Sequence, residues 1–415
     1  MQVKKHPYRW VVLILLTLGT MLLNYSNIIF AARAMDILTE YNCNETQLAL
    51  ISSISFLPGV FLSAIVGRMV DKLGSKKVIV VSMILVAIFF LLRVFIHNYW
   101  ALFACTLGAG ICIVPAGVIP AKMLRVWFPD SEMQIAFGIY GNAPGLGTTV
   151  AFATCAIFAK VSGAFLFVAI VAAVLFLLWL LIGKNAPEGY VEQAPAPAEG
   201  AKKGTYGKLL KTPFFWTILF NGFVGCGASL TINTFMILAF MGKGLETAPA
   251  VVTTMNTILL VGGILSGFIV GAVKRINISY FVQCVPGIII FVLAWFLPLG
   301  AYTPWLIWIG AFFWTGNVNV AMSKISLLPY TGKVDASELG AANGLMNTAI
   351  SLGGFACPLI ISAICQTANG LNYNLFFIIV AILYIAAGVL NLFSPELGEK
   401  GKLAKAYNAK MAEDK

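Results

Sequence analysis

The chain has 415 residues, of which 60% are hydrophobic and only 10% are charged, and its formal net charge is +11. A soluble domain is nearer one quarter charged, so this composition excludes an ordinary water-soluble enzyme or binding module. Apolar runs of about 20 residues, the length that crosses a bilayer as a helix, recur along the whole chain. The sequence therefore predicts an all-α membrane protein with many spans.

Twelve apolar segments are expected, six on each side of one long polar stretch. They span residues 9–33, 46–66, 78–96, 99–124, 134–159, 162–183, 213–240, 248–273, 279–299, 303–328, 338–365 and 373–393. The stretch 184–211 is rich in Pro, Gly, Ala and Lys, a composition typical of a flexible linker. The expected organisation is an N-terminal six-helix bundle (1–183), a cytoplasmic linker (184–211), a C-terminal six-helix bundle (212–393) and a cytoplasmic tail (394–415).

The basic residues are distributed unevenly between the two sides of the predicted membrane. If the N-terminus is cytoplasmic, the inner loops and tails hold 21 of the 27 Lys and Arg residues. The outer side then holds Arg33, Arg93, Lys160 and Lys243. This is the positive-inside pattern, which explains the net charge without a nucleic-acid partner. It predicts a protein of a bacterial-type inner membrane with both termini in the cytoplasm.

The two halves resemble each other in sequence. An offset of 206 residues aligns "HPYRW" (6–10) with "TPFFW" (212–216) and Asn27 with Asn233. An offset of 202 aligns Lys122 with Lys324. These matches indicate a duplicated six-helix unit with pseudo-symmetry, an arrangement typical of transporters.

The loop after the second segment carries a specific motif. "GRMVDKLGSKK" (67–77) matches the pattern G-x-x-x-D-x-x-G-x-[RK]-[RK] at every position, and the chain is similar to the major facilitator superfamily in this loop, in its twelve segments and in its linker. The resemblance implies a transporter that works by alternating access, in which ion pairs of this loop act as a cytoplasmic latch. The latch residues would be Gly67, Arg68, Asp71, Gly74, Lys76 and Lys77. The equivalent loop of the second half, 267–277, lacks the acidic residue, so an asymmetric latch is expected.

Within the superfamily, two short stretches are similar to the oxalate/formate exchanger branch. They are "RVWFPD" (125–130) and "LLKTPFFW" (209–216), while the general organisation also resembles the nitrate/nitrite and cyanate permeases. The chain departs from these branches, because segments 8 and 11 lack the basic residues of the exchangers. Segment 2 likewise lacks the arginine of the nitrate porters. No particular solute can therefore be carried over.

Polar residues within the segments are the candidate solute contacts. The resemblance implies that helices 1, 4, 7 and 10 line a central cavity. An amide without a partner is costly in lipid, so such groups should face a cavity or another helix. The alternative is hydrogen bonding between helices, which is common in bundles. The predicted solute-binding residues are Lys122, Lys324, Asn27, Asn233, Tyr25, Tyr140, Asn142, Asn317 and Asn347.

Lys122 and Lys324 interrupt apolar runs near predicted segment ends. Either they line the cavity and make its potential positive, or they are anchors whose ammonium groups reach the interface. All 16 acidic residues lie in loops, tails or segment edges, so neither lysine has an embedded counter-ion. The cavity reading predicts a small, carboxylate-like anion as the solute.

The lack of embedded acids also bears on coupling and on function class. A proton relay through an embedded carboxylate is not expected, which favours exchange (an antiporter) or facilitated diffusion. No catalytic constellation, metal cluster or cofactor motif is present, so the chain is not expected to be an enzyme. Two alternatives stay open: efflux of a larger amphiphilic or aromatic compound, and a membrane sensor on a transporter scaffold. The protein is expected to work as a monomer in the lipid bilayer.

Overall fold

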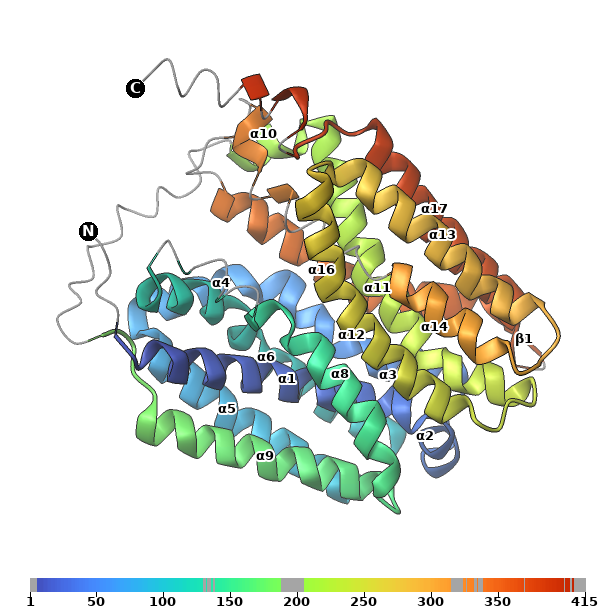
Figure 1. Ribbon diagram of the computed structural model, residues 1–415. Helices are drawn as coiled ribbons and strands as arrows, with labels where there is room; N and C mark the ends of the chain where they lie inside the picture. The colour runs from blue at the N-terminus through green and yellow to red at the C-terminus, as the bar shows by residue number, and fades with distance from the viewer. Residues whose placement is uncertain are drawn as a thin grey trace. The chain divides into compact units, whose positions relative to one another are not determined.

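A computed structural model describes most of the chain, and it divides into two compact units that are considered separately below (Figure 1). The first unit comprises Met1–Glu192 with Asn233–Leu238, and the second comprises Gln193–Ile232 with Ala239–Lys415. The described residues are 6–129, 132, 136, 139–187, 205–314, 324–325, 327–331, 334, 339–368, 370–398, 400–403 and 405–406.

Besides Asn233–Leu238, which belong to helix α11 (Pro213–Gly242), helices make up most of the described residues of the first unit. They are α1 (Arg9–Ala32), α2 (Ala34–Glu40), α3 (Glu45–Ser53), η1 (Ile54–Phe56), α4 (Leu57–Leu73), α5 (Ser75–Leu92), η2 (Arg93–Phe95), α6 (Tyr99–Trp127), α8 (Ala143–Thr154), η3 (Cys155–Ile157) and α9 (Val161–Ile182). In this unit α1 packs against α8 and α9, and α5 packs against α6 and α9.

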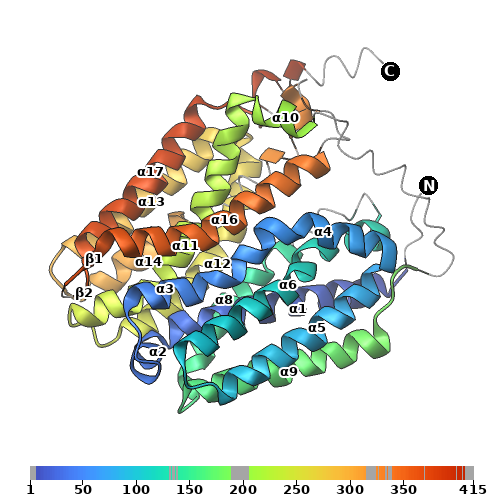
Figure 2. The same ribbon diagram turned by 180° about the vertical axis from the view of Figure 1, so that it is seen from behind.

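The second unit is helical apart from one short hairpin. Its elements are α10 (Thr205–Leu210), α11 (Pro213–Gly242), α12 (Ala248–Val273), α13 (Ile276–Phe296), α14 (Thr303–Trp314), η4 (Leu328–Thr331), α16 (Leu339–Cys365), β1 (Gln366–Thr367), β2 (Gly370–Leu371) and α17 (Tyr373–Phe393). The two strands pair antiparallel, with Gln366 opposite Leu371. Helix α13 packs against α14 and α17, which is visible from behind in Figure 2.

Ten helical stretches among the described residues are long and apolar enough to cross a membrane. They fall on ten of the twelve predicted segments. The other two segments, 134–159 and 303–328, are described only in part, as α8 and α14. Helices satisfy their own backbone hydrogen bonds, which is why long apolar runs adopt this form in lipid.

Part of the predicted linker departs from the flexible state expected of it. Residues 188–204 lie outside the described residues, but Thr205–Leu210 form the short helix α10. Leu209 is fully buried in a cluster with Phe215 and Leu328. The composition of the stretch gave no sign of this helix, because the cluster that buries Leu209 includes residues more than 100 positions away, such as Leu328.

The repeat is visible in how the helices pack within each unit. Gly147 of α8 lies so close to α1 that an added Cβ would collide with the Met21 carbonyl oxygen. Gly353 of α16 lies in the same way against the Phe223 carbonyl oxygen of α11. The two glycines are 206 positions apart, whereas the carbonyl oxygens that they meet are 202 positions apart, so the two contacts differ by one helical turn. Small residues allow such close helix contacts in membranes, so the duplication extends to backbone packing.

Candidate functional site

One face of α1 in the first unit carries a row of half-buried polar side chains. Thr20, Asn24 and Asn27 follow each other at helical spacing, and we call them the α1 stripe. The Thr20 hydroxyl donates a hydrogen bond to the Tyr140 hydroxyl at 3.2 Å, and the Asn24 amide donates to the Thr20 carbonyl oxygen at 3.1 Å. The Ser55 hydroxyl donates to Asn27 Oδ1 at 3.0 Å. The stripe is therefore held in place by its neighbours while it stays partly accessible.

Tyr25 lies on a different face of α1 from the stripe. Its side chain is only 2% exposed, and its hydroxyl forms a 2.7 Å hydrogen bond with Thr154 Oγ1 at the end of α8. Its ring packs 5.5 Å from that of Phe167 on α9. Tyr25 therefore links α1 to α8 and α9, as expected for hydrogen bonding between helices, and its role in solute binding stays a prediction.

The remaining predicted polar contacts have different environments. In the first unit, Tyr140 and Asn142 are half-buried at the start of α8. Asn233 on α11 is 8% exposed, whereas Asn347 on α16 is an exposed amide inside a membrane-spanning helix. An amide in that position needs water or a polar ligand beside it. Asn317 lies outside the described residues.

The two repeat-related lysines differ in their surroundings. Lys122 is half-buried on α6, close to the loop end of that helix. Lys324 is 1% exposed, and its ammonium donates to Asn391 Oδ1 at 2.6 Å and to Ser394 Oγ at 2.8 Å, at the end of α17. The Lys324 ammonium is therefore engaged by side chains of the second unit, and its assignment to solute binding stays a prediction.

Glu396 completes this arrangement in the second unit. Its carboxylate attracts the Lys324 ammonium and accepts hydrogen bonds from the backbone N–H groups of Ile276 and Asn277, at 2.8 and 3.0 Å. These groups begin α13, where a negative charge is favoured by the helix dipole. The Asn277 side chain also donates to the Ser394 carbonyl oxygen at 2.7 Å. The lysine and the carboxylate thus join α17 to the start of α13.

The motif loop of the first unit (67–77) contains the turn between α4 and α5. Gly74 ends α4 and precedes α5 with φ of 85° and ψ of 147°, a conformation that favours glycine. The backbone N–H of Lys76 donates to the side-chain oxygen of Asn185 at 2.6 Å. Gly67 lies inside α4, and Arg68 and Lys77 are exposed. The Asp71 side chain lies outside the described residues, so the latch stays a prediction.

Arg93, one of the cations predicted for the outer side, is enclosed by other side chains of the first unit. Its side chain is fully buried, and the guanidinium donates to Ser26 Oγ at 2.7 Å. It also lies over three aromatic rings, 4.8 Å from the centroid of Phe90, 5.5 Å from Phe30 and 5.9 Å from Phe165. Cation–π contacts of this kind stabilise a cation away from water. Arg93 therefore ties α1, α5 and α9 together.

Two other cations predicted for the outer side donate hydrogen bonds to backbone carbonyl groups near helix ends. Arg33 donates to the Cys155 carbonyl oxygen at 3.0 Å, beside the end of α8. Lys243 donates to the Leu297 carbonyl oxygen at 2.7 Å, just after α13, and burial lowers its pKa. Cations at the carboxyl ends of helices pair with carbonyl groups that have no helical partner. Both side chains therefore have structural roles.

Sequence reasoning missed Thr20, Asn185 and Glu396. Thr20 had a signal, because it lies one helical turn before Asn24 in the same apolar run. Glu396 lies just after the last predicted segment, at the start of the predicted tail. Neither Asn185 nor Glu396 could be connected to a helix start about 110 to 120 residues away without coordinates.

The sequence model of the Major Facilitator Superfamily matches residues 14–334. A probable nitrate transporter of Staphylococcus haemolyticus is 26% identical over 358 residues, covering 84% of this chain and 87% of that protein. A nitrite extrusion protein of Bacillus subtilis is 23% identical over 374 residues, covering 88% and 89%. A hexuronate transporter of Escherichia coli is 26% identical over 253 residues, and the match spans only 57% of this chain and 58% of that transporter.

Solved structures share the fold at low sequence identity. An inward-facing bacterial homologue of the human lysosomal transporter Spinster has a TM-score of 0.76 and 15% identity, covering 94% of this chain and 98% of its own. The inward-open xylose transporter XylE of E. coli has a TM-score of 0.72 and 14% identity, covering 95% and 98%.

Proposed function

The chain belongs to the Major Facilitator Superfamily, and we propose that it carries a small anion across the membrane by alternating access. It is an integral inner-membrane transporter and not an enzyme. The proposal concerns the solute class and the residues that handle it.

The chemistry of the relatives supports an anionic solute. The three relatives described above are named for hexuronate, nitrate and nitrite, which differ in size and shape but share a negative charge. A hexuronate carries a carboxylate, and nitrate and nitrite are planar oxyanions. The shared requirement is a cation with hydrogen-bond donors around it.

The observation that carries the proposal is the charge balance of the membrane-spanning helices. Among the ten described spans, the only acidic residue is Glu45, at the first position of its helix. Lys122 is half-buried in one of these spans. A cation in an apolar span raises the local electrostatic potential, which draws anions.

We assign the roles as follows within the first unit. Lys122 attracts the anion, and the α1 stripe with Tyr140 supplies amide and hydroxyl groups that orient it. Such neutral donors hold an oxyanion without a second full charge, so binding stays weak enough for release.

The same charge balance supports exchange or facilitated movement. Proton-coupled transport usually relies on a titratable group inside the membrane, and the described spans offer no central carboxylate for it. We propose an antiporter or uniporter whose solute carries the charge. The motif loop with Asp71 would latch one access state on the cytoplasmic side, with both termini on that side and the protein acting as a monomer.

Transport by the purified chain in proteoliposomes tests the solute class. Vesicles are loaded with unlabelled anion, and uptake of labelled nitrate, nitrite or glucuronate is measured against neutral xylose and a lipophilic cation. Uptake of at least one anion, accelerated by the same anion inside, is the expected result. Transport of xylose or of the cation with none of the anions would overturn the proposal and would favour a carrier of larger or uncharged compounds.

A further inference from the structure

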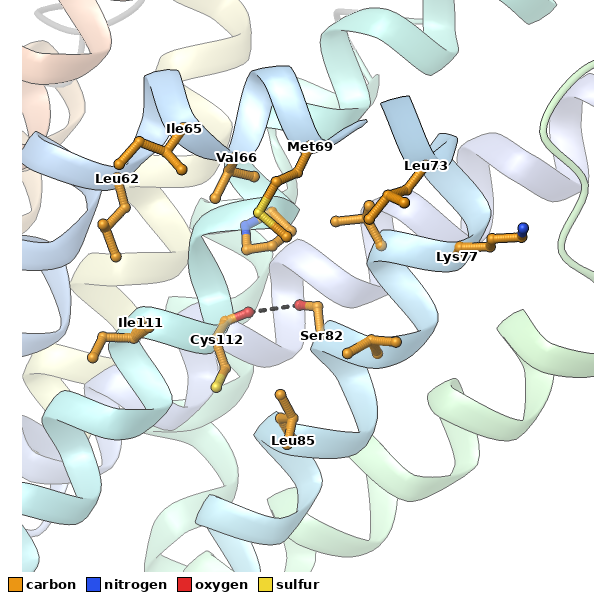
Figure 3. A pocket seen from close by; sticks show the side chains of 13 residues that line it. Leu62, Ile65, Val66, Met69, Leu73, Lys77, Ser82, Leu85, Ile111 and Cys112 are labelled. Atoms are coloured by element: carbon orange, nitrogen blue, oxygen red, sulfur yellow. Dashed lines mark hydrogen bonds between the residues drawn. The ribbon is translucent and has the colours of Figure 1, made fainter. Parts of the chain in front are cut away.

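An apolar groove lies on the first unit, away from the α1 stripe. It has a volume of about 510 Å³ and is walled by α4 and α5, with α6 as its floor. Figure 3 shows Leu62, Ile65 and Met69 on one wall and Leu85 on the other. Val81, which also lines it, is 57% exposed. The groove is therefore open along its length, and its size is comparable with that of one fatty acyl chain.

The one hydroxyl in the groove is already satisfied. Ser82 donates a 2.6 Å hydrogen bond to the Cys112 carbonyl oxygen, which links α5 to α6 (Figure 3). The floor near this bond is completed by the ring of Pro115, which has no N–H to offer. An occupant would find almost no open donor or acceptor along the walls, which selects an apolar group.

The two ends of the groove differ in charge. Lys77 lines the end formed by the α4–α5 turn, and Figure 3 shows its ammonium directed away from the apolar side chains. Arg68 and Lys72 are exposed on the adjoining turns of α4. No charged residue lines the rest of the groove. The groove is thus amphipathic, with a basic head and an apolar body.

The length of the groove fits one leaflet of a bilayer. Leu62 and Leu73 are eleven residues apart on α4, which is about 16 Å of helix. Half of a typical hydrocarbon core is about 15 Å. A chain anchored at Lys77 would therefore reach about the middle of the membrane, the depth expected of an acyl chain from the leaflet on that side.

We propose that this groove binds a phospholipid with an anionic headgroup, whose phosphate pairs with Lys77 and whose acyl chain fills the groove. An acyl chain gains little from leaving other lipid, because both surroundings are apolar. The walls therefore define shape, while the choice among lipids comes from the charge. Basic residues at a membrane surface favour anionic lipids by about 1 kcal/mol each, which is on the order of fivefold.

Photo-cross-linking in liposomes tests this site on the full-length protein. Phosphatidylglycerol and phosphatidylcholine with the same diazirine-bearing acyl chain are each added in trace amounts to phosphatidylcholine bilayers, and adducts are mapped by mass spectrometry. Adducts of phosphatidylglycerol are expected in residues 62–85 and 111–115, at several-fold higher yield than those of phosphatidylcholine.

Four variants separate the contributions of charge and shape. Lys77→Gln should lower the phosphatidylglycerol yield on the order of fivefold, and Lys77→Arg should restore it. Val81→Trp, which fills the groove, should lower the yield for both lipids. Lys160→Gln, an exposed cation beyond η3, should change neither.

Equal yields for the two headgroups, or a Lys77→Gln yield equal to that of the unaltered protein, would overturn the proposal. Native mass spectrometry of the same samples is expected to show phospholipid on the monomer. A lipid-free dimer that Val81→Trp abolishes would instead assign the groove to a second copy of the chain.

Discussion

The α4–α5 turn of the first unit and the α12–α13 turn of the second each contain a residue with positive φ, but they differ in chemistry. Gly74 ends α4 with φ of 85°, and Lys274, at the corresponding place in the second half, has φ of 59°. Asn185 accepts a backbone hydrogen bond near the start of α5, whereas the Glu396 carboxylate accepts two at the start of α13. The duplicated scaffold has kept a residue with positive φ at this place, while different side chains hold the start of the following helix.

The lysines that accompany these turns have diverged further. Lys324 is enclosed by Asn391, Ser394 and Glu396, while Lys122 is half-buried in α6. The second unit therefore uses its lysine to hold helices together. The first unit leaves its lysine partly accessible, which suits a residue that meets a solute. The predictions below separate a structural lysine from a functional one.

The largest effect on stability is expected for Lys324→Met. The change leaves Asn391, Ser394 and the nearby carboxylate without their buried cation. Removing one partner of a buried charged group typically costs about 3 kcal/mol in the free energy of unfolding. Denaturant unfolding in detergent, followed by tryptophan fluorescence, measures it. Lys122→Met is the matched control and should cost less than about 1 kcal/mol; equal losses for the two variants would remove the distinction.

Gly74→Ala is expected to give the next largest loss in the free energy of unfolding. The backbone at this residue, with φ of 85° and ψ of 147°, is costly for any residue with a Cβ, by about 2 kcal/mol. Lys274→Gly is the counterpart in the second unit and should change the free energy of unfolding by less than about 1 kcal/mol. The same denaturant measurement applies, and a neutral Gly74→Ala would show that the first turn tolerates a side chain after all.

Glu396→Gln is expected to have a smaller effect, of about 1 kcal/mol. The amide oxygen still accepts a hydrogen bond at the start of α13, but the favourable interaction of a full charge with the helix dipole and with Lys324 is lost. Glu246→Gln, in the exposed loop after α11, is the control and should lie within about 0.5 kcal/mol of the unaltered protein. A Glu396→Gln value inside that range would mean that the carboxylate is dispensable for the turn.

Sequence patterns predicted the fold far better than the site. Span lengths follow from the run of apolar residues, which is a local property, and the motif 67–77 with the repeat indicated the family before any coordinates. The direction in which a polar side chain points depends on how the helices pack, which the local sequence does not determine. Tyr25 and Asn27 are two residues apart on one helix, yet Tyr25 contacts α8 and Asn27 accepts a hydrogen bond from Ser55.

The burial of charged side chains was the other property that could not be predicted from the sequence. Arg93 was counted among the outer-side cations because it lies at the end of an apolar run, but Phe90 of the adjoining helix α5, together with two aromatic rings and Ser26 from distant parts of the chain, encloses it. Lys324 finds its partners 67 and 70 residues later in the chain. Contacts between residues so far apart leave no periodic signal, so composition and spacing could not distinguish a structural cation from a functional one.

Anion exchange by Lys122→Gln in proteoliposomes tests the central claim most directly. The account predicts that this variant inserts, unfolds close to the midpoint of the unaltered protein, and loses at least about tenfold in anion counterflow, because a charge–anion contact of about 1.4 kcal/mol or more is removed. Lys122→Arg should retain a measurable part of the activity. Unchanged counterflow in correctly inserted Lys122→Gln would contradict the account.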